Sequence, residues 1–302
     1  MAIIEKSIKS NRDGLILGIT IVTPAKNRKI NGIVQLVHGM SEHRKRYLPF
    51  MNFLAKKGYV SIIHDHRGHG ESVKNNKDLG YFYDKSANYI VEDTYQITEL
   101  IKKEYPDKKI ILFGHSIGSL VVRNYIQKYD EVVDKIILCG SPSNTKKVWF
   151  GLLITFILEK IKGPSYRSEY IQNLIFKNYY NKFEDKNWMF TNKEETIKYK
   201  KDKKCGFILT LNGFKNLFKL FIRTYNKKRY LFNNKELKVL FISGAEDPVM
   251  ITEDDFYESC DFLRDIGYDV NHILYKDKRH ELLSEDIKEI VYEDVLEFIK
   301  GN

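Results

Sequence analysis

Short apolar runs alternate with segments of helical periodicity along the first 140 residues. Runs rich in β-branched and other apolar residues predict strands at residues 15–22, 32–37, 60–63, 109–113 and 135–139. Between several of these runs, apolar residues that recur every three or four positions predict helices at residues 47–57, 89–105 and 116–129. Strands that alternate with helices favour a mostly parallel sheet flanked by helices on both faces.

The alternation stops near residue 141 and resumes at residue 237. Strands are predicted again at 237–242 and 270–275, and helices at 253–266 and 284–300. The intervening segment is aromatic, basic and helix-like, without a repeat of strand and helix. We therefore expect an α/β fold in which residues 1–140 and 237–302 form the core and residues 141–236 are inserted as a helical cap, or lid.

The first candidate for chemistry is a serine at the junction of a predicted strand and a predicted helix. The residues around Ser116 read Gly-His-Ser-Ile-Gly, and a strand precedes them. A strand, Gly-x-Ser-x-Gly and a helix form a sharp turn that holds the serine hydroxyl clear of the sheet. Larger side chains would collide in this turn, so Gly114 and Gly118 support it, with His115 as the neighbour of the serine. We expect Ser116 to be a nucleophile.

A serine hydroxyl is a poor nucleophile unless a base removes its proton, and the second half of the chain supplies a base and an acid. Asp247 follows the strand predicted at 237–242, and His280 follows the strand predicted at 270–275. Both lie just beyond the carboxyl end of a strand, where parallel sheets place their sites. The chain order of serine, aspartate and histidine predicts a triad of Ser116, Asp247 and His280.

Other residues compete for two of these roles. Glu246 is adjacent to Asp247, but Asp247 leads directly into Pro248, where the turn forms. Asp277 is a weaker rival because its position in the loop would crowd the histidine. His272 lies within a strand pattern, so we expect it to pack rather than to react.

A developing oxyanion needs backbone amides that are fixed before the reaction. Ile117 directly follows the nucleophile at the start of a predicted helix. We expect the second amide from the loop after the early strand, at His38-Gly39-Met40, and assign it to Met40. The dipeptide His38-Gly39 is equally compatible with an ordinary turn at the end of a strand.

Several motifs resemble those of the monoglyceride lipase and lysophospholipase branch of the α/β-hydrolases. That branch has the patterns His-Gly-x-x-Glu-His-x-x-Arg-Tyr, Asp-x-x-Gly-His-Gly-x-Ser, Gly-His-Ser-Met-Gly and Arg-His-Glu, and the matching segments begin here at His38, Asp65, Gly114 and Arg279. In the insertion, Asp202-Lys-Lys-Cys-Gly-Phe is similar to the branch's Asp-Pro-Leu-Cys-Gly-Phe. The similarity covers most of the chain and is weakest in the insertion.

The resemblance implies the α/β-hydrolase fold, a serine esterase that works through an acyl-enzyme without a cofactor, and a mobile cap over a lipophilic tunnel. It implies a small lipid-like ester as the substrate, of the monoacylglycerol or lysophospholipid type. Two positions depart from the branch: Ser119 replaces a glycine, which would tighten the elbow, and Ile117 replaces a methionine. The cap differs most, so acyl length and head group stay open.

The inserted segment is rich in apolar residues. The run at 148–158 is too short to cross a bilayer but long enough for a lid helix. A second helix-like stretch contains the apolar residues Phe207, Ile208, Leu209, Leu211, Phe214, Leu217, Phe218, Leu220 and Phe221. Some of these side chains form the core of the cap, but together they offer more apolar surface than a cap of this size needs to bury. We expect an acyl-binding channel.

The positive charge of the chain is concentrated in the same region. Residues 144–236 hold 21 Lys and Arg against 8 Asp and Glu, a net of +13, whereas the remainder carries −3. No helix-turn-helix, zinc-finger or RNP pattern accompanies this charge, so we expect no nucleic-acid partner. The lysines are compatible with an ordinary solvated surface, or with transient contact between the cap and an anionic membrane surface.

The cysteines and the apolar runs of the chain indicate the cellular compartment to expect. Cys139, Cys205 and Cys260 are too widely spaced for a disulfide framework or a zinc knuckle. The first residues are charged too early for a signal peptide, and no apolar run reaches the length of a membrane span. We expect a cytoplasmic protein with reduced thiols.

Other functions are compatible with parts of the sequence. His64-x-His66-x-Gly68-His69 is similar to a metal motif of binuclear hydrolases, but Gly68 replaces a ligand and no downstream histidine cluster completes a site, so we expect no metal. A non-catalytic ligand-binding protein on the same fold usually lacks a member of the triad. An esterase or thioesterase of other small acyl substrates, an amidase and a C–C hydrolase remain alternatives.

Overall fold

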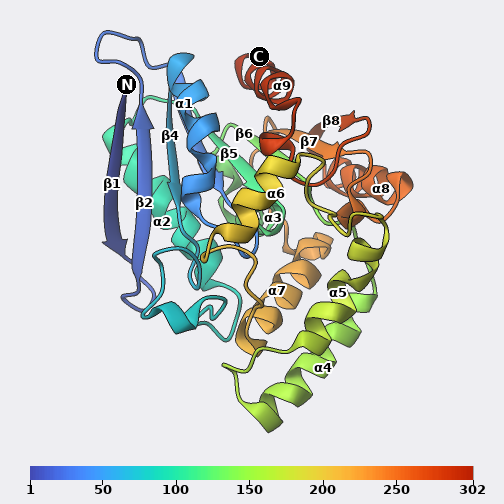
Figure 1. Ribbon diagram of the computed structural model, residues 1–302. Coiled ribbons are helices and arrows are strands. Elements are labelled where there is room, and N and C mark those ends of the chain that lie inside the picture. Colours follow the sequence, from blue (N-terminus) through green and yellow to red (C-terminus); the bar gives the residue numbers. More distant parts are fainter. Residues whose placement is uncertain (302) are drawn as a thin grey trace.

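A sheet of eight strands forms the centre of the computed structural model, which describes residues 1–301 (Figure 1). Neighbouring strands are parallel from β4 across to β8, whereas β1 and β2 are antiparallel to their neighbours. The predicted α/β class with a mostly parallel sheet is confirmed. In spatial order the strands are β1 (Ala2–Lys9), β2 (Ile16–Thr23), β4 (Tyr59–His64), β3 (Gly32–Val37), β5 (Ile110–His115), β6 (Lys135–Cys139), β7 (Lys238–Gly244) and β8 (Asp269–Tyr275).

Helices cover both faces of the sheet, and this explains why its central strands read as continuous apolar runs. Every residue of β3, β5 and β6 is buried. On one face pack α1 (Leu48–Lys56) and α9 (Lys288–Lys300). On the other face pack α2 (Tyr89–Glu104), α3 (Ile117–Tyr129) and α8 (Glu253–Arg264).

Strand β1 and helix α9 differ from the sequence prediction. β1 lies at the edge of the sheet with most of its side chains exposed, so it lacks the buried face that produces a hydrophobic pattern. The helix predicted at 284–300 begins only at Lys288, because Glu285 turns its carboxylate toward Thr191 and accepts bonds from the main-chain N–H and the hydroxyl of that residue.

Short 3₁₀ turns link several of the larger elements. They occupy positions where the chain changes direction, three of them beside the site described below. Their bounds are η1 (Arg44–Tyr47), η2 (Asn76–Asp78), η3 (Asp130–Val132), η4 (Lys227–Arg229), η5 (Pro248–Met250) and η6 (Leu282–Ser284).

The segment 141–236 contains helices α4 (Lys147–Lys162), α5 (Glu169–Asn181), α6 (Lys193–Lys201) and α7 (Leu211–Thr224). Helix α7 begins later than the apolar run that predicted it, because the Thr210 side chain accepts a hydrogen bond from the Gly213 N–H and caps the helix. It packs against α3 of the core and against α4. Figure 1 shows α4, α5 and α7 grouped together below the sheet. The division into a core domain and a cap domain remains a prediction.

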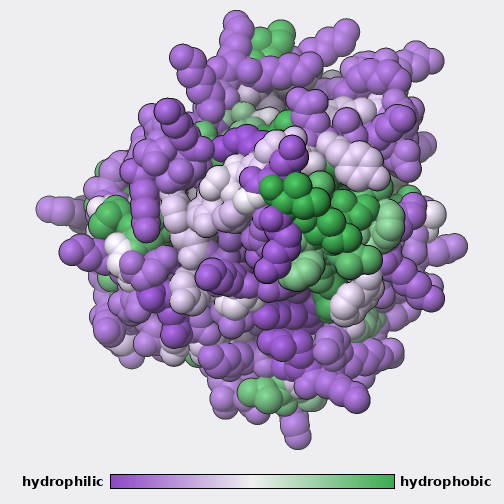
Figure 2. All heavy atoms as spheres, turned by 90° about the horizontal axis from the view of Figure 1, so that it is seen from below, coloured by the Kyte–Doolittle hydropathy of each residue, from purple (hydrophilic) through white to green (hydrophobic). Residues whose placement is uncertain are grey.

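An apolar patch lies on the molecular face seen from below in Figure 2, the side on which Figure 1 shows α4 and α5. Helix α4 contributes large side chains that are about half exposed or more: Trp149, Phe150, Leu153, Phe156, Ile157 and Ile161. Within residues 1–301, no helix combines the length and the hydropathy that a membrane crossing requires.

Candidate active site

Ser116 occupies a sharp turn between β5 and α3. Its backbone angles are φ 53° and ψ −120°, a strained conformation that residues other than glycine rarely adopt. A Cβ atom on Gly114 would lie 2.6 Å from the Gly118 carbonyl oxygen, and one on Gly118 would lie 2.0 Å from the Val37 carbonyl oxygen. Both glycines are therefore required by close backbone approach, as the motif predicts.

Hydrogen bonds hold the strained turn in place. The Ser116 N–H donates to the Cys139 carbonyl at 2.8 Å, which fixes the turn to the neighbouring strand β6. The Ser119 hydroxyl donates to the Ser116 carbonyl at 2.5 Å. Ser119, which replaces a glycine of the related motif, thus adds a bond to the turn.

His280 and Asp247 form a buried pair beyond the ends of β8 and β7. The Nδ1 atom of His280 lies 2.7 Å from Oδ2 of Asp247, and the two side chains are 2% and 0% exposed. The Val249 N–H donates to the other carboxylate oxygen of Asp247 at 2.9 Å, and the Ser243 hydroxyl approaches Oδ2 at 3.3 Å. These contacts fix the carboxylate in the orientation that holds the imidazole.

The rival residues lie elsewhere. The Glu246 carboxylate faces Arg279 at 3.9 Å rather than a histidine. Asp277 is exposed at a position with φ 55°. His272 is exposed on β8 and packs its ring against Tyr257, with the ring centroids 5.1 Å apart. The structure thus brings Asp247, and not its rivals, to His280.

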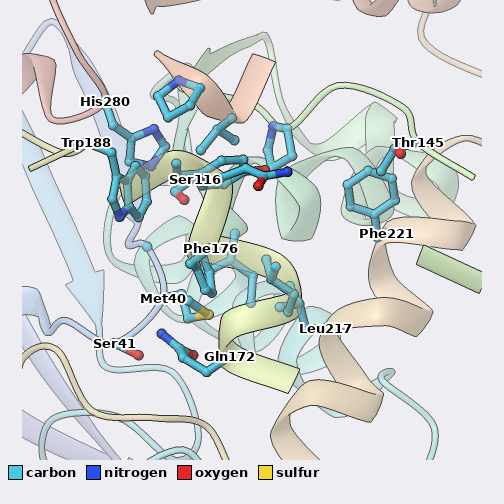
Figure 3. Close-up of a pocket in the computed structure, with 18 of the residues that line it drawn as sticks. Met40, Ser41, Ser116, Thr145, Gln172, Phe176, Trp188, Leu217, Phe221 and His280 are labelled. Carbon is cyan, nitrogen blue, oxygen red and sulfur yellow. The ribbon is translucent and has the colours of Figure 1, made fainter. Parts of the chain in front are cut away.

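Ser116 and His280 line one cavity of about 1060 Å³. Figure 3 shows them close together at one end of it, with Trp188 beside His280. The ring centroids of Trp188 and His280 are 5.0 Å apart. Trp188 belongs to the inserted segment, and no motif in the sequence predicts its place beside His280.

Most of the remaining cavity wall comes from the inserted segment, including three of its helices. Val148 and Phe150 of α4, Phe176 of α5, and Leu217 and Phe221 of α7 all line it. Figure 3 places Phe176 and Leu217 below Ser116, and Phe221 toward the far side. Both apolar stretches that predicted an acyl channel therefore contribute side chains to one cavity that reaches Ser116.

The loop after β3 forms the other side of the serine. Met40 and Ile117 line the cavity, and Ile117 opens α3, so its N–H has no acceptor within that helix. The Gly39 N–H donates to the Glu42 carboxylate at 2.5 Å and is therefore occupied. This geometry leaves Met40 and Ile117 as the predicted amide donors, and their role remains a prediction.

His38 supports this loop within a cluster of four buried histidines, His38, His64, His66 and His69, whose rings meet tilted or edge-on. The His38 Nε2 accepts a hydrogen bond from the His66 N–H at 2.9 Å, and the His66 Nε2 donates to the His38 carbonyl at 3.1 Å. Burial lowers the pKa of His38 and His66, that of His64 to about 3 and that of His69 to about 4. The histidines of the metal-like motif are therefore neutral near pH 7.

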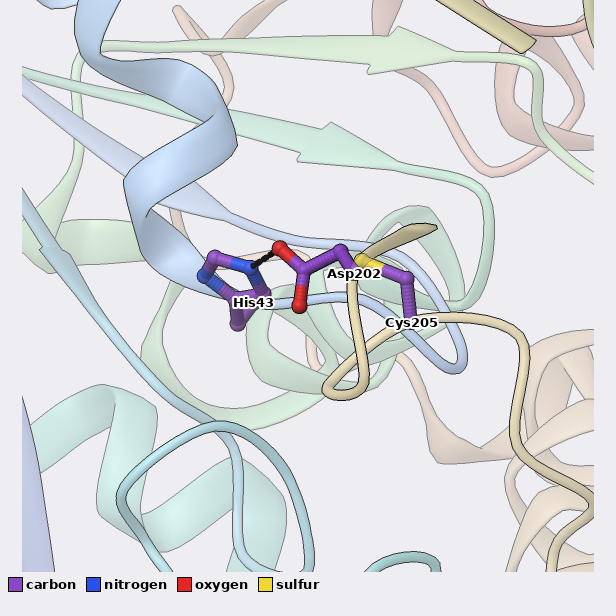
Figure 4. Close-up of side chains that lie close together, drawn as sticks. All are labelled: His43, Asp202 and Cys205. Carbon is purple, nitrogen blue, oxygen red and sulfur yellow. Dashed lines mark hydrogen bonds and ion pairs between the residues drawn. The ribbon is translucent and has the colours of Figure 1, made fainter. Parts of the chain in front are cut away.

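A contact between the core and the inserted segment closes the same loop. The Ser41 carbonyl accepts bonds from the Gly206 N–H at 2.8 Å and the Tyr199 hydroxyl at 3.0 Å. Nearby, His43 and Asp202 share a hydrogen bond of 2.8 Å, and Cys205 lies beside them (Figure 4). The ligand atoms of His43, Asp202 and Cys205 lie within 4.8 Å of one another and are of types that could hold a metal ion.

Known proteins resemble this chain in sequence. A family model described as "Serine aminopeptidase, S33" (Hydrolase_4) matches residues 28–287. Monoglyceride lipase of Mus musculus is 30% identical over 155 residues, which are 49% of this chain and 49% of the relative. Monoacylglycerol lipase of Mycolicibacterium smegmatis is 29% identical over 113 residues, 37% of this chain and 39% of the relative. The chain thus spans about half the length, or less, of these curated relatives.

A solved structure matches over nearly the whole length. The thermostable carboxyl esterase from Bacillus coagulans, in complex with glycerol, superimposes with a TM-score of 0.92 at 25% identity. The match covers 100% of this chain and 99% of that chain. The expected α/β-hydrolase fold is confirmed.

Proposed function

Because the chain belongs to the serine aminopeptidase S33 family of α/β-hydrolases, we propose that it is a serine hydrolase that cleaves carboxylic esters of lipophilic acyl groups. Ser116, Asp247 and His280 are its catalytic triad. The proposed substrates are of the monoacylglycerol or lysophospholipid type.

The reaction proceeds in two halves through an acyl-enzyme. His280 takes the proton of the Ser116 hydroxyl, and the serine oxygen attacks the ester carbonyl. The amides of Met40 and Ile117 stabilise the oxyanion of the tetrahedral intermediate. The alcohol leaves with the proton held by His280, and water then hydrolyses the acyl-enzyme by the same route.

Asp247 orients and stabilises the base during both halves. Its carboxylate accepts the Nδ1–H of His280 at 2.7 Å, which leaves the other ring nitrogen to exchange protons with the serine and the alcohol. Burial of the pair strengthens the attraction between the carboxylate and the imidazolium that forms.

The observation that carries the proposed substrate class is the junction of Ser116 with an apolar cavity of about 1060 Å³. Aromatic and aliphatic side chains from α4, α5 and α7 line the cavity. A space of this volume accommodates a long acyl chain and would bury little of a small polar acyl group. Esters or thioesters of smaller acyl groups are the alternative substrates, and ligand binding without turnover is the alternative function.

The inserted segment 141–236 acts in this proposal as a cap over the acyl site. The half-exposed apolar side chains of α4 and the surrounding lysines suit transient contact with an anionic lipid surface, from which the substrate would enter. The cap residues that line the cavity would contact the lipid surface first and then the acyl chain of the bound substrate.

The test is hydrolysis of a graded series of acyl esters, monoacylglycerols and lysophospholipids by the wild type and by Ser116→Ala. We expect turnover that increases with acyl length up to the capacity of the cavity and that disappears in Ser116→Ala. A preference for acetyl esters over all longer chains would favour the small-acyl alternative. A wild type that binds fatty acids but turns over no ester or thioester would favour the binding function.

A further inference from the structure

A cluster of four charged side chains, three of them buried and one partly buried, lies between the loop after β3 and the loop that carries His280. It consists of Glu42, Arg46, His115 and Glu281. Glu42 and His115 are 2% and 3% exposed, and Glu281 is 8% exposed. Burial of so many charges is costly unless each is paired, so the arrangement calls for a reason.

Glu42 ties the cluster to the predicted oxyanion loop. Its carboxylate accepts hydrogen bonds from the Gly39 N–H at 2.5 Å and from the Tyr47 hydroxyl at 2.8 Å. It also forms an ion pair with Arg46. Gly39 directly precedes Met40, so the carboxylate fixes the peptide that precedes the predicted amide donor.

His115 ties the cluster to the loop of the predicted base. Its Nε2 atom lies 3.3 Å from the backbone carbonyl of His280. On the other side of the ring, Nδ1 lies 3.1 Å from the Tyr47 hydroxyl and 3.4 Å from the Glu42 carboxylate. A carbonyl and a carboxylate can only accept hydrogen bonds. The Tyr47 hydroxyl gives its proton to Glu42, so it faces Nδ1 as an acceptor too. The ring donates on both sides only when both of its nitrogens carry protons.

We propose that Glu42 and protonated His115 are positioning residues, which together hold the oxyanion loop and the loop of His280 at the spacing that ester hydrolysis requires. This inference rests on the proposed function. When Nδ1 of His115 loses its proton, the ring no longer donates to Glu42, and the Tyr47 hydroxyl can bond to Nδ1 only by turning its own proton away from Glu42. Either way Glu42 loses a donor, and the link between the two loops weakens.

The charges around His115 favour its protonated form. Burial alone would lower the pKa of His115, but the carboxylates of Glu281 and Glu42 outweigh burial and the repulsion of Arg46 and raise it to about 9. Arg46 is itself engaged by both carboxylates, with 3.0 Å to Glu281.

The other titratable groups that face His115 do not supply competing charge. Tyr47 from η1 is buried beside Glu42, and both effects raise the pKa of its hydroxyl, which stays neutral. Cys139 of β6 pairs with His115 in the sheet, and burial and nearby carboxylates raise the pKa of its thiol. The His280 ring also lies beside His115, with 4.8 Å between the ring centroids.

The pH profile of activity should therefore have an alkaline limb, a fall in rate at high pH that is caused by deprotonation of His115. We expect kcat of the wild type, measured on a soluble ester and corrected for spontaneous hydrolysis, to fall around pH 9 with little change in KM. In His115→Gln, which has no titrating group, kcat should drop about 10- to 100-fold at neutral pH and the alkaline limb should disappear. Glu42→Gln should also lower kcat, and it should move the alkaline limb to lower pH, because Glu281 still raises the pKa of His115. Glu42→Asp, which keeps the charge, should recover part of the rate and bring the limb back toward its wild-type position.

A matched control separates this role from general damage to the core. His64 is also a fully buried histidine, and neither ring nitrogen has a hydrogen-bond partner among residues 1–301. His64→Gln should retain the alkaline limb, whatever its stability. A His115→Gln enzyme with the wild-type limb would overturn the proposal, and so would a His64→Gln enzyme that lost the limb.

The charge on His115 can be observed without any activity. The chain has 8 histidines. In protein labelled with ¹⁵N-histidine, we expect a signal at pH 7.5 with both ring nitrogens protonated, titrating near pH 9 and absent from His115→Gln. Absence of such a signal, or its survival in the variant, would overturn the proposal. A wild type that shows the signal but hydrolyses no ester would instead refute the proposed function.

Discussion

Nδ1 of His280 and Oδ2 of Asp247 are 2.7 Å apart, and both side chains are almost fully buried. A contact between an imidazole and a carboxylate at this distance fixes the tautomer of the ring. We expect Asp247→Asn to reduce kcat about 10⁴-fold, since the amide can turn its donor toward the ring and favour the wrong tautomer. Burst and steady-state kinetics on a chromogenic ester measure the effect.

Glu246→Gln is the control for this substitution, because the adjacent carboxylate does not contact His280. It should keep the wild-type rate within a factor of about 3. An equal loss of kcat in Asp247→Asn and Glu246→Gln would mean that disturbance of the local fold, and not loss of the contact with His280, lowers the rate.

The glycines of the turn at Ser116 should tolerate no side chain. In Gly118→Ala, the new methyl group would lie 2.0 Å from the Val37 carbonyl oxygen, so a backbone shift is unavoidable. We expect a loss of about 3 kcal/mol in the free energy of unfolding, or an insoluble protein, together with loss of activity. Urea unfolding measures it, and Gly301→Ala, whose methyl group would lie 3.5 Å from the nearest atom, should be close to neutral.

Leu217 of α7 should limit the acyl length that the cavity accepts, because it lies in the wall below Ser116. Leu217→Trp should shift the preferred ester toward shorter chains, and Leu217→Ala toward longer ones, because the substitutions remove and add apolar volume. Rates on the shortest ester should stay within a factor of about 3 of the wild type. An unchanged length profile in both variants would place the acyl chain elsewhere.

The exposed face of α4 should bind anionic lipid. Leu153 and Phe156 are 56% and 51% exposed, and neither lines the cavity. The double variant Leu153→Glu, Phe156→Glu should lose retention on vesicles that contain phosphatidylglycerol while it still hydrolyses a soluble ester. Vesicle flotation measures binding.

Ile290 of α9 provides the matched control, since it is 58% exposed on a helix of the core. Ile290→Glu should bind vesicles like the wild type. If the wild type is not retained on any vesicle, the proposed contact between α4 and a membrane surface is wrong.

The four buried histidines below the predicted oxyanion loop should make the fold sensitive to mild acid. Their pKa values are lowered in the folded state, so between about pH 6.5 and 4.5 the unfolded chain binds protons that the folded chain does not. The free energy of unfolding should therefore fall with decreasing pH, by about 1.4 kcal/mol per pH unit for each such histidine. His64→Gln should reduce the dependence of the free energy of unfolding on pH by about 1.4 kcal/mol per pH unit, the contribution of one histidine. A free energy of unfolding that does not change between pH 6.5 and 4.5 would contradict the lowered pKa values of these four histidines.

The sequence predicted the parts of the site that local pattern determines. Gly114, Gly118 and Ser116 follow from one strand-turn-helix motif, and the structure gives the steric reason for both glycines. Asp247 and His280 follow from the rule that sites lie at the carboxyl ends of parallel strands. The central strands were predicted within about two residues because burial on both faces makes them continuously apolar.

Features that depend on tertiary contacts could not be predicted from the sequence. β1 has no buried face, so no periodicity marked it. Trp188 reaches His280 only through the path of the inserted segment. Glu42 stood in a recognised motif, but its bond to Gly39 and its link to His115 need the folded loops.

The most direct test of the central claim is the reaction of the wild type with a fluorophosphonate, followed by mass spectrometry of the peptides. A single adduct on the peptide that contains Ser116, no adduct in Ser116→Ala, and loss of ester turnover in proportion to labelling are the predicted results. A Ser116→Ala protein that is still labelled and still hydrolyses esters would contradict the account, because another residue would then be the nucleophile.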